Sequence, residues 1–315
     1  MFVLALIFIL QVYAPGEEGT FSIIGRDPST GELGIGVQSR TISVGSRTRS
    51  AKGGVAVIAH QASSNPYYGE MGIELIEKGM TPEQALDFLL RSDDGRESRQ
   101  VAILDAQGRT AAFTGNQPNE WKGHKCGANY CAQGNILAGP NVVENMARAF
   151  ETTTGPLAER LLAALEAAQA AGGDQRGTQS ASIMVVKPLS GPAGFSDRTV
   201  DLRVDESRAP IPELRRILNV MRSGEMLTDA NRKANGGDLN GALAAAIAAR
   251  DKAPANDNAW VAIANFNLRL NRKPEAMEAL RKAIELNSGN KRQLMRNQNF
   301  RQLHDDPDFL RIIGN

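Results

Sequence analysis

The sequence lacks the features that define several large functional classes. Its 36 Lys and Arg residues are balanced by 35 Asp and Glu residues, so it has no field that would attract nucleic acid or an anionic membrane. It contains no Walker phosphate loop, no HExxH motif and no Ser-His-Asp order. Gly34 and Gly36 do not make a dinucleotide loop, because the third glycine is missing and strand residues follow. We therefore expect neither a nucleic-acid partner nor a nucleotide cofactor.

Cysteine and histidine are also scarce. Cys126 and Cys131 are the only cysteines in 315 residues, and His124 lies beside them. A structural zinc ion needs four ligands at regular spacing, which this segment does not supply, so we expect no metal and no cofactor. The two cysteines either form a disulfide in an exported protein or pack as small buried hydrophobic residues. The sequence leaves both readings open.

Long apolar runs are absent except at the beginning of the chain. Residues 1–14 read MFVLALIFILQVYA and end in Val12-Tyr13-Ala14, a pattern typical of signal-peptide cleavage. The run is too short to span a bilayer comfortably. We interpret residues 1–19 as a signal or leader segment and expect a secreted or periplasmic protein without a membrane span. No Lys or Arg precedes the run and Pro15 follows it, so a misassigned start codon and a cytoplasmic protein are the alternative.

Residues 20–222 combine strand-like and helical patterns. Two apolar runs, Phe21–Arg26 and Leu33–Gln38, flank a turn-rich connection and predict a hairpin, and a second hairpin is expected within residues 100–114. Between these hairpins, Thr81-Pro82-Glu83-Gln84 supplies an N-cap, a first-turn proline and acidic support for a helix. Grouped strands followed by grouped helices indicate an α+β fold in which sheets are layered with helices.

Residues 226–315 give only strong helical signals. Two segments resemble each other at a spacing of about 34 residues, with Ala242 and Ala246 in the first and Ala276 and Leu280 in the second. Small residues at these positions let paired helices approach closely, as in tetratricopeptide (TPR) repeats. We expect a small all-α TPR-like domain here, and a plain helix bundle is the alternative.

Four separated runs carry a family resemblance. They read TFSIIGRDPSTGELGIGVQSR (20–40), GGVAVIAHQASSNPYYGEMGIELIEKGMTPEQAL (53–86), QGNILAG (133–139) and GGDQRGTQSASIMVV (172–186). In this order they resemble the Ntn-hydrolase-like family known as domain of unknown function 1028 (DUF1028). The resemblance implies a four-layer αββα sandwich of two antiparallel sheets between helix layers, and it brings no established substrate. In that family a threonine before Phe-Ser lies at or next to the mature start, and Thr20 matches it.

Thr20 is the candidate nucleophile. If the chain is cut between Gly19 and Thr20, one residue carries both a hydroxyl group and a free α-amine. A threonine hydroxyl needs an adjacent base to remove its proton, and an α-amine with an unperturbed pKa of about 7.7–8.0 is such a base near neutrality. The alternative is that Thr20 is only a β-branched strand residue.

Gln38, Ser39 and Arg40 end the second predicted strand. Related proteasome-type sites keep an Asp-Ser-Arg cluster at this place, and it positions the terminal amine and hydroxyl. A glutamine in place of the aspartate can hydrogen-bond the amine but cannot form an ion pair with it. Ser39 and Arg40 are the expected catalytic partners and Gln38 a binding residue; the alternative is that they only cap a hairpin.

Other polar residues complete the expected site. Gln61 begins a polar loop and is a candidate substrate-binding residue. Asn65 in the same loop is the candidate oxyanion donor, or else the loop caps the next helix. Asn135 lies in an apolar stretch, where an amide must find partners, so it is either structural or substrate-binding. Asp174, Arg176 and Gln179 occupy a Gly-bounded turn and either reach the same pocket or remain solvated.

These residues together predict an exported amidohydrolase that cleaves a linear amide, in a small molecule or a peptide, through an acyl-enzyme at Thr20. The alternative is a noncatalytic Ntn-like binding protein whose helical tail binds a peptide or a cell-wall component. A homo-oligomer is compatible with either hypothesis.

Overall fold

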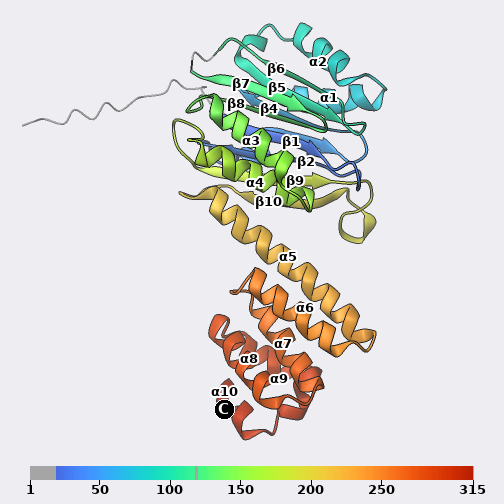
Figure 1. The fold of residues 1–315 in the computed structure, drawn as a ribbon, viewed down its shortest axis with the longest axis vertical. Coiled ribbons are helices and arrows are strands. Elements are labelled where there is room, and N and C mark those ends of the chain that lie inside the picture. Colours follow the sequence, from blue (N-terminus) through green and yellow to red (C-terminus); the bar gives the residue numbers. More distant parts are fainter. Residues whose placement is uncertain (1–18, 118–119, 315) are drawn as a thin grey trace, which may run out of the picture. The chain divides into compact units, whose positions relative to one another are not determined.

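The computed structural model describes residues 19–117 and 120–314, so the predicted leader lies outside the described residues except for Gly19. The chain divides into two compact units, the first ending at Leu214 and the second spanning Arg215–Asn315 (Figure 1). The sequence-based boundary between residues 222 and 226 falls inside helix α5 (Pro210–Asn235), which continues through both positions.

The first unit contains two antiparallel sheets. The six-stranded sheet has the order β10-β9-β2-β1-β8-β7 and the four-stranded sheet has the order β3-β4-β5-β6. The strands are β1 (Thr20–Arg26), β2 (Leu33–Ser39), β3 (Arg49–Lys52), β4 (Ala56–Ala62), β5 (Arg99–Asp105), β6 (Thr110–Thr114), β7 (Lys122–Gly127), β8 (Tyr130–Asn135), β9 (Ser180–Val186) and β10 (Arg198–Val204).

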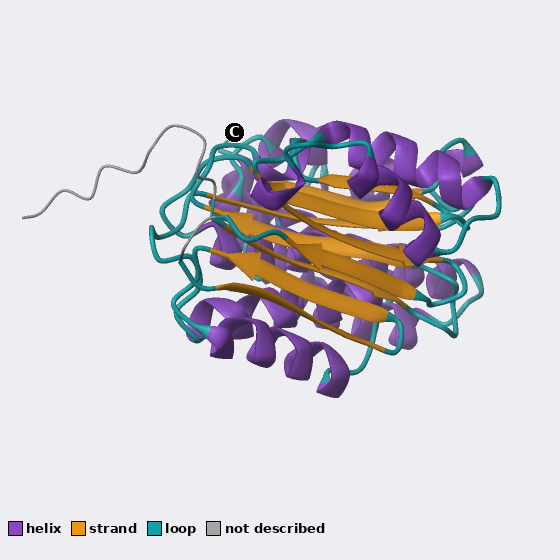
Figure 2. Cartoon of the chain, turned by 90° about the horizontal axis from the view of Figure 1, so that it is seen from above, coloured by secondary structure: helices purple, strands orange, loops and turns teal. Residues whose placement is uncertain are grey.

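Helices cover the outer face of each sheet. Helices α1 (Pro66–Glu77) and α2 (Pro82–Arg91) pack on the four-stranded sheet, and α3 (Pro140–Thr152) and α4 (Leu157–Ala170) pack on the six-stranded sheet. The strands therefore lie between helices (Figure 2). The predicted mixed fold with antiparallel sheets and a C-terminal helical region is confirmed.

Local sequence explains two features of this packing. Thr81 begins α2 with a capping box, because its side chain accepts from the Gln84 N–H while the Gln84 side chain accepts from the Thr81 N–H. Gly34 lets α4 approach β2 closely, since an added Cβ would lie 2.8 Å from Leu161 Cδ1. The two sheets meet in an apolar layer that includes Ile24, Ile35, Val57, Ala102 and Leu104.

Cys126 and Cys131 form a disulfide across the β7–β8 hairpin, with Cα atoms 4.0 Å apart. Of the two readings that the sequence left open, the structure has the disulfide. In the described part of the chain, no group of three or more His, Cys, Asp and Glu side chains is arranged to hold a metal ion. None of the described helices is long and apolar enough to cross a membrane.

The second unit is helical. After α5 come α6 (Leu239–Lys252), α7 (Asp257–Arg269), α8 (Lys273–Leu286), α9 (Asn290–Arg296) and α10 (Pro307–Ile313). Helices α6 and α8 both begin and end 34 residues apart (239 to 273 and 252 to 286). Fully buried alanines line the core of the unit, among them Ala242, Ala246, Ala264 and Ala276.

Candidate functional site

One end of the layer between the sheets is polar, although the rest of it is apolar. Alternate residues of a strand face the same side, so Thr20 and Ser22 of β1 face the opposite sheet together with Ile24. Polar residues at the corresponding ends of four other strands face them. Together they form the Thr20 cluster: Thr20, Ser22, Ser39, Gln61, Gln100, Gln133 and Asn135, all buried.

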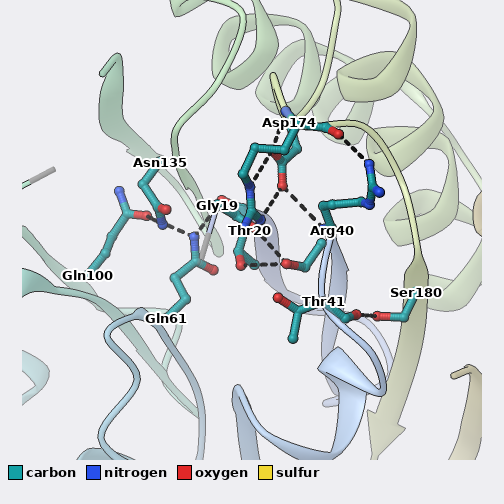
Figure 3. A network of polar contacts seen from close by, with 11 residues as sticks. Gly19, Thr20, Arg40, Thr41, Gln61, Gln100, Asn135, Asp174 and Ser180 are labelled. Atoms are coloured by element: carbon teal, nitrogen blue, oxygen red, sulfur yellow. Dashed lines mark hydrogen bonds and ion pairs between the residues drawn. The ribbon is translucent and has the colours of Figure 1, made fainter. Parts of the chain in front are cut away.

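Strand register brings Thr20 beside two predicted site residues. Ser39 of β2 and Asn135 of β8 are its direct cross-strand neighbours. The Thr20 hydroxyl donates to Ser39 Oγ at 3.1 Å, and Ser39 Oγ donates to the Gly19 carbonyl oxygen at 2.6 Å. Figure 3 labels Gly19 and Thr20 together with Gln61, Gln100 and Asn135. Ser39 thus links the candidate nucleophile to the carbonyl group of the peptide bond that precedes it.

Three buried amides hold the strand carrying Thr20 in place. Gln61 Nε2 donates to the Thr20 carbonyl at 2.9 Å and to Gln100 Oε1 at 2.8 Å. Asn135 Nδ2 donates to the same Gln100 oxygen at 3.0 Å, and Ser22 Oγ donates to Gln61 Oε1 at 2.6 Å. Asn135 Oδ1 is buried without a hydrogen-bond partner among the described residues. The amide of Asn135 is therefore half satisfied beside Thr20.

A buried ion pair between Asp174 and Arg176 contacts Gly19. Arg176 Nη2 donates to the Gly19 carbonyl at 2.6 Å and to Asp174 Oδ2 at 2.7 Å. An added Cβ on Gly19 would lie 2.9 Å from both Asp174 carboxylate oxygens, so only glycine fits at this position without a shift of the pair. The Gly19 carbonyl oxygen thus accepts from one guanidinium and one hydroxyl donor.

Arg40 and Gln179 tie this turn to the end of β2. The Arg40 N–H donates to Asp174 Oδ2 at 3.2 Å, and its exposed guanidinium donates to the Arg176 carbonyl at 2.6 Å. The Gln179 N–H donates to the Ser39 carbonyl at 3.1 Å. Arg40 and Gln179 thus support the turn and β2 through contacts to neighbouring residues.

Two predicted site residues lie elsewhere. Gln38 is the cross-strand neighbour of Phe21 and faces the helix side of the sheet, because adjacent strand residues point to opposite faces. Asn65 is the N-cap of α1, where its side chain accepts from the Tyr67 N–H at 3.1 Å. This is the helix-capping role that the sequence offered as the alternative for the loop.

Three members of the Thr20 cluster, Ser22, Gln100 and Gln133, had no expected role from the sequence. Gln100 accepts from two other amides of the cluster, and its Nε2 donates to the Gly134 carbonyl at 2.9 Å. In the sequence, Gln100 is a lone polar residue at the start of an apolar strand. This pattern fits an exposed strand end as well as a buried site residue. Arg176 stood in the Gly-bounded turn, but nothing local directs its side chain toward Gly19.

His60 precedes Gln61 on β4 and faces the opposite way, toward α1. Burial lowers its pKa to about 4, so the imidazole is neutral near pH 7. Its Nδ1 lies 2.9 Å from Ser64 Oγ. His60 therefore cannot serve as a base for Thr20, because the sheet lies between them.

Comparisons with known proteins agree with the fold. The model of the family of unknown function DUF1028 matches residues 20–214. The chain is also similar to a Silicibacter pomeroyi protein whose crystal structure is described with the same family model. The two sequences are 33% identical, and the aligned part covers 64% of this chain and 84% of the other chain, with a TM-score of 0.58. No protein with curated function matches the chain. The match begins at Thr20 and includes every residue of the Thr20 cluster, and the chain belongs to the DUF1028 family.

Proposed function

We propose that the first unit is an N-terminal-nucleophile amidohydrolase with Thr20 as its nucleophile, active once the Gly19–Thr20 bond is broken. The observation that carries the proposal is the chain of contacts from the Thr20 hydroxyl through Ser39 Oγ to the Gly19 carbonyl. Four layers of helix, sheet, sheet and helix, with the nucleophile on the first residue of β1, support an Ntn-type sandwich.

The proposed reaction uses groups of Thr20 itself. Its hydroxyl oxygen attacks the carbonyl carbon of the substrate amide while the free α-amine takes the hydroxyl proton. The tetrahedral intermediate collapses, the amine returns the proton to the leaving nitrogen, and the acyl group stays on the Thr20 oxygen as an ester. Water activated by the same amine then hydrolyses this ester.

Arg176 and Ser39 are better oxyanion donors than Asn65 in this proposal. Arg176 Nη2 and Ser39 Oγ both donate to the Gly19 carbonyl oxygen, whereas the Asn65 side chain is used at the helix N-terminus. Release of Gly19 frees these two donors next to Thr20. Loss of one oxyanion donor typically lowers kcat by about 10²–10³-fold.

We also infer a role for the rest of the chain. Residues 1–19 act as an export leader, which places the mature protein outside the cytoplasm. The 34-residue offset between α6 and α8 and the buried alanines of the second unit support a TPR-like array that binds a peptide or a cell-wall component. Substrates are small amides or peptides.

Two measurements test the amidohydrolase. Intact mass of protein from its native compartment should give Thr20 as the first residue. Thr20→Ala should abolish turnover of small amides, and Thr20→Ser should keep part of it because the hydroxyl and the amine both survive. Thr30→Ala, which removes an exposed hydroxyl from the turn between β1 and β2, is the matched control and should leave turnover unchanged.

The second candidate is a noncatalytic binding protein. It is favoured by the placement of Gln38, because this residue faces away from Thr20 and cannot hold an ammonium group there. A mature N-terminus at Pro15 or Gly16, together with no hydrolysis of any amide, supports this candidate and contradicts the enzyme.

A further inference from the structure

A polar cavity lies at the edge of the first unit, built from residues outside the Thr20 cluster. Its volume is about 660 Å³, within the range of small-molecule sites. Edge strand β3 of one sheet and edge strand β10 of the other supply half of its lining residues, and α1 supplies Gly69, Glu70 and Ile73. A smaller cavity of about 380 Å³ shares Ser46, Arg49, Ser50 and Glu70 with it.

Three guanidinium groups and two carboxylates line the β3–β10 side of this cavity. Asp201 on β10 accepts from Arg49 at 2.5 Å and from Arg198 at 2.8 Å. Arg203 also lines the cavity, and in the described part of the chain no side chain forms an ion pair with it. The two carboxylates of Asp197 and Asp201 face three guanidinium groups, so this wall carries one surplus positive charge.

Arg49 is the buried member of this wall. Its side chain is only 5% exposed, and its Nη1 has no hydrogen-bond partner among the described residues. Burial lowers the pKa of Arg49, and the nearby Arg203 and Arg198 lower it further. A buried guanidinium with an unused donor is costly, and an anionic ligand would relieve both the desolvation and the repulsion.

The other charged groups of the cavity have different partners. Lys52 pairs with Glu77 at 2.5 Å, and Asp197 accepts from the Gly53 N–H at 2.7 Å. Glu70 on α1 lines both cavities and has no ion-pair partner among the described side chains. The cavity thus presents two guanidinium groups with unused donors, those of Arg49 and Arg203, on its β3–β10 wall and one free carboxylate on α1.

We propose that this cavity binds an acidic α-amino acid, whose two carboxylates contact the guanidinium groups of Arg49 and Arg203 and whose ammonium group contacts Glu70. Each charged group of such a ligand then faces a group of opposite charge that has a free donor or acceptor. The site does not depend on amide hydrolysis, since it shares no residue with the Thr20 cluster.

Isothermal titration of the full chain with L-glutamate and with glutarate, which lacks the amino group, tests this site. We expect saturable binding of both, with glutamate the tighter ligand. Arg203→Gln should weaken both by at least about tenfold, because a charge-assisted contact is lost. Glu70→Gln should weaken glutamate alone. Both side chains are exposed, so neither variant disturbs the core.

Matched substitutions on α2 serve as controls. Arg91→Gln and Glu83→Gln remove the same charges far from the lining of the cavity and should leave both affinities unchanged. The proposal is overturned if neither ligand binds saturably, if glutarate binds as tightly as glutamate, or if the control variants weaken binding as much as Arg203→Gln. Tighter binding of inorganic phosphate than of glutamate also contradicts it.

Discussion

Replacement of Asp174 by asparagine tests whether the buried ion pair beside Gly19 holds the site together. The Asp174 side chain is fully buried, and that of Arg176 is 9% exposed. Asp174 Oδ2 accepts from Arg176 Nη2 at 2.7 Å and from the Arg40 N–H at 3.2 Å. Its Oδ1 accepts from the Arg176 N–H at 2.9 Å and from Arg176 Nε at 3.1 Å.

An asparagine can satisfy only one half of these contacts. Its amide nitrogen is a donor and would face the N–H donors that now bind the carboxylate. The Arg176 guanidinium also loses the negative charge that compensates its burial. Breaking a buried pair from one side typically costs about 3–5 kcal/mol, and we expect the free energy of unfolding of the first unit to fall by this amount. Asp87→Asn is the control, because the Asp87–Arg91 pair is 58% and 79% exposed and should contribute less than about 1 kcal/mol.

Guanidinium denaturation followed by tryptophan fluorescence measures the change. The two tryptophans lie one in each unit, so a Trp260→Phe background leaves Trp121 as the reporter of the first unit. A shift of the midpoint at constant m gives the free-energy difference. Adding Arg176→Met to Asp174→Asn should recover part of the loss, since no buried charge then remains unpaired. A loss for Asp174→Asn no larger than that for Asp87→Asn refutes the reasoning.

Three further predictions concern stability. Burial lowers the folded-state pKa of His60 to about 4, so the unfolded chain binds the proton first as the pH falls. Up to about 3 kcal/mol of the stability present above pH 6.5 should therefore be lost as the pH falls toward 4. Denaturation at several pH values measures this loss, which should be smaller in the His60→Gln variant. Trp260→Ala should destabilise the second unit by about 2 kcal/mol, as measured by circular dichroism, because the half-buried ring contacts the core and Arg250. Reduction of the Cys126–Cys131 disulfide, which links residues 5 positions apart, should lower the free energy of unfolding by about 2 kcal/mol, because the unfolded chain gains entropy. Denaturation with and without reductant measures this change.

The sequence by itself determined the features that depend on neighbouring residues. The hairpin of β1 and β2, the cap of α2 at Thr81 and the helical second unit follow from alternation, turn residues and helical spacing within short windows. The four family motifs are equally local, and they identified the DUF1028 family correctly. The continuous course of α5 through the expected boundary was not readable, because Gly224 lies within that boundary and a glycine fits a break in a helix as well as its interior.

Only the tertiary structure decided which polar side chains meet at Thr20. Arg176 reaches Gly19 across 157 positions of sequence, and Gln100 meets Asn135 across 35, so no local pattern encodes either contact. Strand register also decides which face of the sheet each side chain occupies, since a shift by one residue turns every side chain of a strand to the opposite face. That alternation places Ser39 at the site and its neighbour Gln38 against the helices. The composition of the Thr20 cluster is thus a property of the stacked sheets, whereas Thr20 was already visible in the sequence as a candidate.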